Sequence, residues 1–161
     1  MKSKSLQLHY QEYTSIHELN EQEQLLLNKA IAQTKNSYSP YSEFKVGAAL
    51  ELENGVFVLG SNQENAAYPS GLCAERTALF TAGANHPEEQ VKAIAIAAQS
   101  DKYKVNGPVF PCGACRQVMA ETEQRGAAPM KVIVGNSTGK VLVFSSIQSL
   151  LPFRFDNLDL A

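Results

Sequence analysis

Apolar residues along the chain recur first with a helical period and then in alternation with polar ones. The helical period covers residues 25–31, after the candidate cap Asn20, and the helix must end before Pro40 because the residue preceding a proline disfavours the α conformation. Apolar and polar residues alternate over 44–51 and again over 56–60, and an Asn-Gly turn separates the two runs. The pattern therefore predicts one helix followed by a β-hairpin.

The rest of the pattern predicts helices that alternate with strands. Residues 91–98 are almost wholly apolar, which is typical of a strand buried on both faces. The predicted elements after the hairpin are a helix from about Cys73 to Ala82 that ends near Gly83, a strand from Val91 to Ala98, a helix from about Cys112 to near Gly126, strands over 130–134 and 140–144, and a short helix over 146–151. This order indicates a layered α/β domain with a central sheet of about five strands covered by helices.

The chain divides into a short N-terminal part and one domain. Residues 1–18 are polar and lack clear periodicity, so we interpret them as an N-terminal extension. Residues 19–161 are long enough to bury a core of their own, and they contain no linker or internal repeat. We therefore expect residues 19–161 to form a single domain.

Composition and charge exclude several classes of protein. Hydrophobic residues make up 44% of the 161 residues, which excludes a wholly disordered chain. The 14 basic and 16 acidic residues give a net charge of -2, whereas proteins that bind nucleic acids or membranes through charge carry a basic excess. There is neither an apolar run of about 18 residues nor the apolar stretch of a secretory signal. The odd count of three cysteines favours a reducing compartment, so we expect a cytoplasmic protein without nucleic-acid or membrane partners.

All three cysteines lie where a predicted loop meets a predicted helix. Cys112 and Cys115 are three residues apart, so a helical first turn places both sulfurs on one side, and Cys73 begins the other helix. The positive end of a helix dipole favours the thiolate form at such positions. Three thiolates can bind Zn²⁺ and leave the fourth tetrahedral position open, as a catalytic zinc requires. Cys73, Cys112 and Cys115 can therefore supply the three ligands of a catalytic Zn²⁺.

Two residues next to Cys73 suit the chemistry of such a site. The side chain of Glu75 is long enough to reach a water on the open side of the metal, where it would act as the proton shuttle. Arg76 lies three residues after Cys73 and can donate hydrogen bonds to the thiolate, which offsets the negative charge of three sulfur ligands. Arg116 is open to two interpretations, a surface charge or a second partner of the thiolates.

Four stretches of the sequence resemble the small cytidine deaminases that act on free nucleosides, and the likeness runs from about Tyr38 to Pro152. They are residues 40–42 with 44–49 (PYS and FKVGAA), 62–68 (NQENAAY), 73–78 (CAERTA) and 111–118 (PCGACRQV). Zinc nucleobase deaminases combine cysteine ligands, a glutamate that is not a ligand and a Pro-Cys-x-x-Cys element in this way. The resemblance implies a three-layer α/β fold with a mixed sheet and one Zn²⁺ per subunit. It also implies hydrolysis of cytidine or 2′-deoxycytidine to uridine or 2′-deoxyuridine with release of ammonia, as in pyrimidine salvage.

The resemblance also implies roles for the residues of a nucleoside pocket. Glu75 would take a proton from water, protonate N3 of the base and then protonate the departing amine. Phe44 would pack on the base, and Asn62 and Glu64 would bind the ribose 3′-hydroxyl, with the Glu64 carboxylate repelling a phosphate. Family members are homotetramers that share residues between sites. This implies further substrate contacts at Ala74 and, from neighbouring subunits, at Ala66, Tyr68 and Phe155.

Several other functions remain open on the sequence alone. Cys112 and Cys115 form a Cys-x-x-Cys pair, which also occurs in thiol redox proteins. A zinc aminohydrolase for another cytosine nucleoside would carry the same ligands. An enzyme that edits a polynucleotide would need a basic and aromatic surface, which the net charge of -2 does not favour. A purely structural zinc site would need a fourth ligand, and the histidines lie in no ligand motif: His9, His17 and His86.

Overall fold

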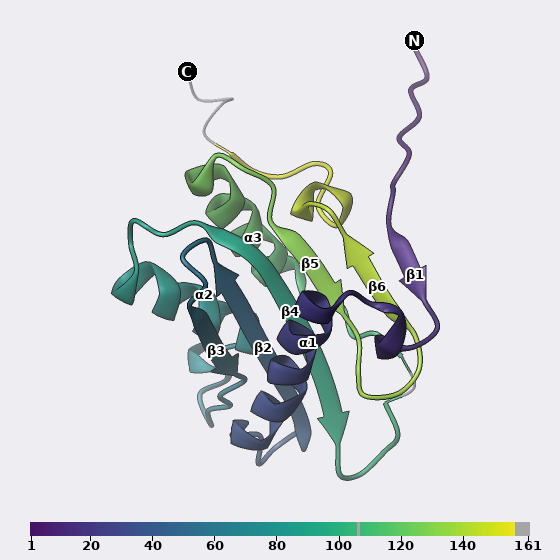
Figure 1. Ribbon diagram of the computed structural model, residues 1–161. Coiled ribbons are helices and arrows are strands. Elements are labelled where there is room, and N and C mark those ends of the chain that lie inside the picture. Colours follow the sequence, from purple (N-terminus) through teal and green to yellow (C-terminus); the bar gives the residue numbers. More distant parts are fainter. Residues whose placement is uncertain (106, 157–161) are drawn as a thin grey trace.

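Six strands form one mixed sheet in the computed structural model, which describes residues 1–105 and 107–156 (Figure 1). The strands are β1 (Gln11–Tyr13), β2 (Phe44–Leu52), β3 (Phe57–Ser61), β4 (Val91–Ser100), β5 (Lys131–Val134) and β6 (Val141–Phe144). Their order across the sheet is β1-β6-β5-β4-β2-β3. Strands β4 and β5 run parallel, and every other neighbouring pair runs antiparallel.

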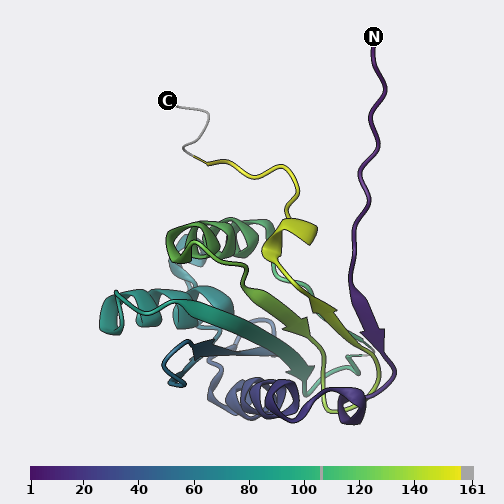
Figure 2. The ribbon, with the colours of Figure 1, turned by 45° about the horizontal axis from the view of Figure 1, so that its top comes forward.

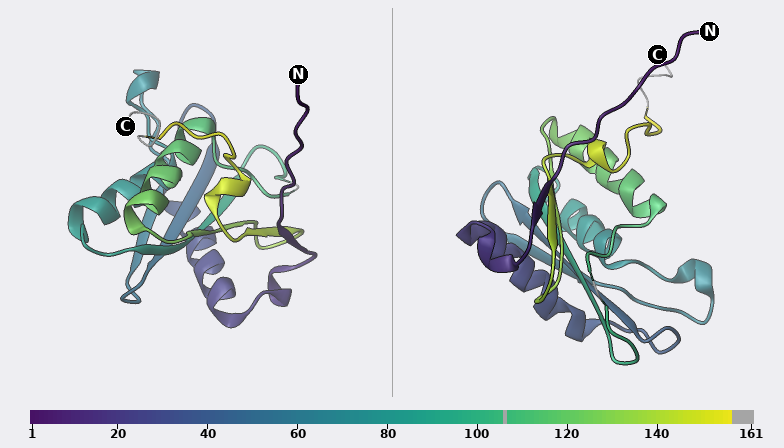
Figure 3. Two further views of the ribbon diagram at one scale, coloured as in Figure 1. Left: turned by 90° about the horizontal axis from the view of Figure 1, so that it is seen from above. Right: turned by 90° about the vertical axis from the view of Figure 1, so that its right-hand side faces the viewer.

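Helices cover both faces of this sheet. Helix α1 (Glu21–Gln33) lies on one face, and helices α2 (Ala74–Asn85) and α3 (Gly113–Gly126) lie side by side on the other, as Figures 2 and 3 show. The alternation along β2 serves both layers, because Ala49 packs in the core beneath α1 whereas Ala48 and Leu50 pack in the core beneath α2 and α3. The predicted three-layer α/β fold with a mixed sheet is therefore confirmed.

Two glycines let helices approach the sheet closely. A Cβ at Gly47 in β2 would lie 2.1 Å from the carbonyl oxygen of Ala30 in α1. A Cβ at Gly60 in β3 would lie 2.5 Å from the carbonyl oxygen of Ala74 and 2.5 Å from the amide nitrogen of Ala78 in α2. No side-chain carbon tolerates such distances, so the two glycines set how close α1 and α2 lie to the sheet. Because α2 begins at Ala74, Gly60 also helps to place the N-terminus of α2.

Part of the predicted N-terminal extension joins the sheet, which explains a sixth strand in the described part of the chain where about five were expected. Strand β1 pairs antiparallel with β6, with Gln11 opposite Val143. Ile16 and Leu19 are buried in the core beneath α1. Three residues are too few for an alternating pattern to stand out, and the partner strand lies near the other end of the chain.

The remaining elements agree with the sequence pattern, apart from small shifts at their ends. The hairpin of β2 and β3 turns at Gly55, whose φ of 81° suits the predicted Asn-Gly turn. Helix α2 continues past Gly83 to Asn85, because Gly83 does not adopt the positive φ with which glycine ends a helix. The short last helix is a 3₁₀ turn at Ile147–Ser149. No helix within residues 1–105 and 107–156 combines the length and hydrophobicity needed to span a bilayer.

Candidate active site

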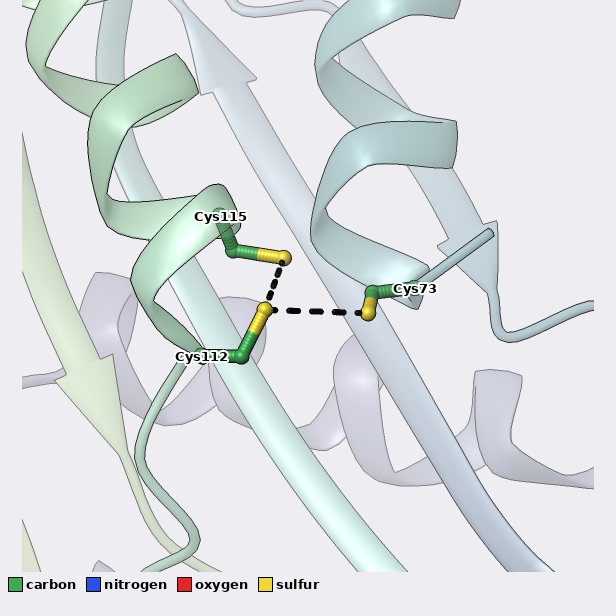
Figure 4. Close-up of side chains that lie close together, drawn as sticks. All are labelled: Cys73, Cys112 and Cys115. Atoms are coloured by element: carbon green, nitrogen blue, oxygen red, sulfur yellow. Dashed lines mark hydrogen bonds between the residues drawn. The ribbon is translucent and has the colours of Figure 1, made fainter. Parts of the chain in front are cut away.

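The N-termini of α2 and α3 lie next to each other, and the three cysteines meet between them (Figure 4). Cys73 is the N-cap residue of α2, Cys112 is the N-cap residue of α3, and Cys115 lies in the first turn of α3. The Sγ atoms of Cys73 and Cys112 are 3.9 Å apart, and those of Cys112 and Cys115 are 3.4 Å apart. All three sulfurs lie within 4.8 Å of one another. Two helix N-termini thus direct three sulfur atoms into one small space.

This arrangement fits a zinc ion. Two sulfur ligands of one tetrahedral Zn²⁺ lie about 3.8 Å apart, because each Zn–S bond is about 2.3 Å long. The separations of 3.4 and 3.9 Å lie on either side of that value, and all three cysteines are free rather than disulfide-bonded. The cluster therefore fits one Zn²⁺ per chain, with one tetrahedral position left for water or substrate. The third sulfur disfavours an isolated thiol redox pair.

The thiols of Cys73 and Cys115 differ in how readily they ionise. The pKa of Cys73 falls to about 5, chiefly because the Cys115 thiol donates a hydrogen bond to its sulfur and also because Arg76 and Cys112 donate, while burial acts in the opposite direction. The pKa of Cys115 rises, because it is that donor and because it is buried. The N-terminus of α2 therefore holds a thiolate that is ready to bind a cation, and a bound divalent cation draws its other thiol ligands into the same form.

Glu75 lies in the first turn of α2 and is only 4% exposed. Burial raises the pKa of its carboxyl, and the negative charge of Cys73 raises it further, while hydrogen bonds from the backbone and from Cys115 act in the opposite direction. A carboxyl with a raised pKa takes up a proton more readily than an ordinary carboxyl, which suits general acid–base catalysis. Glu75 is therefore the candidate proton carrier of this site.

The two arginines near the cysteines have different partners. Arg76 places Nη2 3.6 Å from Cys73 Sγ, and its Nε atom is buried without a hydrogen-bond partner among the described residues. Arg116 instead donates from Nε to the carbonyl oxygen of Pro111 at 2.9 Å and from Nη1 to the carbonyl oxygen of Leu150 at 3.0 Å. The structure therefore supports neither of the two interpretations of Arg116. This side chain ties the loop before Cys112 to the chain after β6.

A cavity of about 550 Å³ adjoins Cys73 and Arg76. Its walls come from the end of β3, the loop that leads to α2 and the segment before β2, and they include Tyr41, Asn62, Glu64 and Tyr68. The loop is closed by two backbone hydrogen bonds between Gln63 and Leu72, of 2.8 and 2.9 Å. The structure therefore brings Asn62, Glu64 and Tyr68 to the same cavity as one of the three sulfurs.

Asn62 is held in place by most of its own hydrogen-bonding groups. Its Oδ1 accepts from the backbone N–H of Val46 at 2.7 Å and from the hydroxyl of Ser37 at 2.6 Å. Its Nδ2 donates to the carbonyl oxygen of Phe44 at 2.8 Å. An amide nitrogen carries two hydrogens, so one donor of Asn62 is left for a ligand.

Glu64 is held in a similar way, but as an acceptor. Its carboxylate accepts from the backbone N–H groups of Tyr41 at 2.8 Å and Ser42 at 3.3 Å, and from the Ser42 hydroxyl. Burial acts to raise the pKa of Glu64, but these three donors outweigh it and lower the pKa. The cavity therefore contains a fixed negative charge.

The other predicted contact residues lie in different surroundings. Ala74 is fully buried at the start of α2, and Ala66 is exposed in the loop before it. Tyr68 is 78% exposed and makes an edge-on contact with Tyr41 at the cavity. Phe155 is 75% exposed, and its backbone is held by the side chain of Gln117 on α3, so within one chain it lies apart from the cavity.

Phe44 begins β2 and stacks on a residue that the sequence pattern did not single out. The ring centroids of Phe44 and Tyr103 are 6.3 Å apart, and their planes differ by 12°. Tyr103 lies in the loop after β4, which matches none of the four family-like stretches. Tyr41 and Ser42 lie in one of these stretches, but no local signal in the sequence predicts that they donate hydrogen bonds to the Glu64 carboxylate.

The family and the relatives of this chain agree with this geometry. Residues 20–130 match the family described as the cytidine and deoxycytidylate deaminase zinc-binding region. The chain is 43% identical to the cytidine deaminase of Halalkalibacterium halodurans over 137 residues, which cover 85% of this chain and 96% of that protein.

Solved structures give the same result. The crystal structure of cytidine deaminase from Burkholderia pseudomallei matches with a TM-score of 0.69 and 42% identity, over 81% of this chain and 97% of that one. The cytidine deaminase structure from Mycobacterium tuberculosis matches with a TM-score of 0.62 and 27% identity, over 82% of this chain and 95% of that one. The sulfur cluster lies within the matched residues, so sequence, fold and metal-binding geometry all assign this chain to the cytidine and deoxycytidylate deaminase zinc-binding family.

Proposed function

We propose that this protein catalyses the zinc-dependent hydrolytic deamination of free cytidine and 2′-deoxycytidine to uridine and 2′-deoxyuridine, with release of ammonia. The observation that carries the proposal is the convergence of three sulfur atoms within 4.8 Å next to the buried carboxyl of Glu75. The adjoining cavity of about 550 Å³ has room for a nucleoside. The 43% identity to a cytidine deaminase over 85% of the chain supports the same reaction.

In this mechanism the residues of the chain hold the metal and move the protons. Cys73, Cys112 and Cys115 hold Zn²⁺, which when bound lowers the pKa of water and so supplies a nucleophile for C4 of the base. Glu75 accepts the proton that the water loses, passes it to N3 and then delivers the second proton of the water to the amino group that leaves C4. One water is consumed and one ammonia is released. Arg76 stabilises the thiolate of Cys73 throughout.

The cavity residues bind the sugar and select nucleosides over nucleotides. The remaining Nδ2 hydrogen of Asn62 donates to the ribose 3′-hydroxyl, and Glu64 accepts a hydrogen bond from it. A phosphate near the Glu64 carboxylate would meet a negative charge that three donors hold in place. Phe44 packs against the base. The substrate is therefore a free nucleoside, and neither a nucleotide nor a nucleic acid.

We further propose that the protein is a cytoplasmic homotetramer of pyrimidine salvage, with residues 19–161 as the catalytic domain and residues 1–18 as an extension. The exposure of Ala66, Tyr68 and Phe155 supports an assembly in which a neighbouring subunit covers them. In that assembly Ala66, Tyr68 and Phe155 reach the site of a neighbour, Tyr68 also lines the cavity of its own chain, and Ala74 contacts the substrate of its own chain.

The experiment that tests the function compares the wild type with Glu75→Gln. The loss of cytidine absorbance is followed with purified zinc-loaded protein, and zinc is counted per chain. We expect the wild type to convert cytidine and 2′-deoxycytidine but not cytosine or cytidine monophosphate. Glu75→Gln should retain zinc and lose about 10²- to 10⁴-fold in turnover, because it removes the proton carrier.

A matched variant controls for the change of charge. Glu121→Gln makes the same substitution on the exposed surface of α3 and should leave turnover at the wild-type level. A zinc-loaded wild type that does not convert cytidine would contradict the proposed function. An active Glu75→Gln variant would contradict the role of Glu75 alone.

A further inference from the structure

The loop after β4 is fastened to the start of β2 by three side-chain contacts. The Lys45 ammonium pairs with the Asp101 carboxylate, and Lys102 Nζ lies 2.6 Å from Glu43 Oε1. In addition to these two ion pairs, the rings of Phe44 and Tyr103 stack, with centroids 6.3 Å apart and planes that differ by 12°. The three contacts join three consecutive residues of one segment to three consecutive residues of the other.

The Phe44 ring lies on the side of the sheet that carries the cysteines. Side chains of a strand alternate between faces, so Phe44 shares a face with Val46 and Ala48, which pack in the core beneath α2 and α3. The backbone of Phe44 is bound at both polar groups by residues that line the cavity, because its N–H donates to Ser42 Oγ at 3.1 Å and its carbonyl accepts from Asn62 at 2.8 Å. Phe44 is therefore tied through its backbone to two residues of the cavity wall, and it is half-buried.

Of the three contacts, the ring stack fixes this side chain. The ion pairs lie near the surface, with side-chain exposures of 28% and 68% for Lys45–Asp101 and of 58% and 40% for Lys102–Glu43, and exposed pairs contribute little. Phe44 is half-buried at the first position of β2, and the Tyr103 ring packs parallel to it, which restricts the rotamers of Phe44.

We propose that Tyr103 is a positioning residue for nucleobase binding, which holds the Phe44 ring in the orientation against which the pyrimidine packs. This inference rests on the proposed function, because it takes Phe44 as the residue that packs on the base. A ring fixed before the substrate arrives loses no conformational freedom when the base binds, so Tyr103 increases affinity without touching the reacting atoms. The two ion pairs join the loop that carries Tyr103 to the start of β2.

The inference predicts a separation of binding from chemistry. Tyr103→Ala should raise KM for cytidine by about two- to tenfold, which corresponds to the interaction energy of one aromatic pair. It should leave kcat within about twofold of the wild type. Tyr103→Phe keeps the ring and should restore the wild-type KM. Both variants should keep the zinc content of the wild type, since Tyr103 lies outside the sulfur cluster.

The experiment measures kcat, KM, zinc content and thermal midpoint for the zinc-loaded full chain and its variants. Lys104→Ala, next to Tyr103 and also exposed, is the matched control and should behave as the wild type. If Tyr103→Ala folds poorly, Tyr103→Leu provides the same test, because it keeps much of the volume without a flat ring.

The outcomes separate this inference from the function on which it rests. A raised KM in Tyr103→Ala together with recovery in Tyr103→Phe supports the positioning role. An unchanged KM in Tyr103→Ala, an equal change in Lys104→Ala, or a Tyr103→Phe variant that behaves like Tyr103→Ala would overturn it while the deaminase activity stands. A wild type that does not convert cytidine would overturn both.

Discussion

The N-termini of α2 and α3 begin alike and then differ in what they present to the space between them. Each helix has a cysteine at its N-cap, Cys73 in α2 and Cys112 in α3. The first turn of α2 then carries Glu75 and an arginine that bonds to sulfur, whereas the first turn of α3 carries a second, fully buried cysteine. The candidate metal ligands and the candidate proton carrier are therefore divided unequally between two similar helix ends.

The two arginines sharpen this comparison. Arg76 approaches the sulfur of its own N-cap residue, while Arg116 turns to the carbonyl oxygens of Pro111 and Leu150. The α3 end is thus fixed from outside by backbone contacts, which suits a rigid pair of ligands. The α2 end keeps its charged side chains for the site. The difference teaches that the same residue type at nearly the same place in two helices bonds to sulfur in one and to backbone carbonyl oxygens in the other.

Removing a ligand from α3 should have the largest effect. Cys115→Ser replaces a fully buried sulfur with a hydroxyl, which is a poor ligand for zinc. We expect little zinc in the purified protein. Turnover should fall by more than the about 10- to 100-fold that is lost when a residue that hydrogen-bonds to a metal ligand is mutated. Zinc per chain and cytidine turnover check this, with Glu75→Gln as the control that keeps zinc. A Cys115→Ser variant with full zinc would show that α3 supplies only one ligand.

Replacing Arg76 or Arg116 by alanine should have different effects at the two helix ends. Arg76→Ala removes a donor to the Cys73 sulfur and should cost about 10- to 100-fold in zinc affinity or turnover. Arg116→Ala leaves two partly buried carbonyl oxygens without their donor, so it should lower the free energy of unfolding by about 1–3 kcal/mol. Chelator competition and urea unfolding measure the two effects. Equal losses of zinc affinity in both variants would contradict the division between the ends.

The layered fold followed from the sequence because its signals are local. Each strand of the hairpin carries its own alternation, and the nearly continuous apolar run of β4 marks a strand covered on both faces. Strand β1 had no such signal, since its three residues are recognisable only by their pairing with β6. Local periodicity predicts an element, but a short edge strand depends on a partner far away in the chain.

The same limit applies to the site. The spacing of Cys112 and Cys115 predicts that these two sulfurs lie together, because helix geometry fixes where a first-turn side chain points. That Cys73 joins them is implied by the family resemblance, since the sequence does not fix how two distant helices pack. The direction of a long side chain is not fixed in this way, so the sequence left Arg116 open. The stacking of Tyr103 on Phe44 depends on the path of a loop, which no periodicity describes.

The unequal pKa values of Cys73 and Cys115 offer a third way to distinguish the N-terminus of α2 from that of α3. After zinc is removed with a chelator, Cys73 with a pKa of about 5 should be a thiolate throughout pH 6.5–8, whereas the raised pKa of Cys115 keeps it protonated. The rate at which iodoacetamide alkylates Cys73 should therefore hardly change between pH 6.5 and 8. The alkylation rate of an ordinary thiol rises about twentyfold over the same range, because its thiolate fraction rises. Peptide mapping identifies the modified residue. A steep rise at Cys73, or earlier modification of Cys115, would contradict the assignment of the preformed thiolate to α2.

The smallest expected effect concerns the first residue of each helix. Ala74 is fully buried at this position of α2, whereas a Cβ at Gly113 in α3 would meet no atom within 4 Å. Gly113→Ala should therefore stabilise the protein by about 0.4–1 kcal/mol, because alanine has fewer unfolded conformations to lose and Gly113 has no positive φ. The reverse change, Ala74→Gly, should destabilise by at least as much, since it also removes a buried methyl group. Urea unfolding of both variants tests the pair. Destabilisation by Gly113→Ala would mean that the first turn of α3 needs its glycine for a close approach that a single chain does not contain.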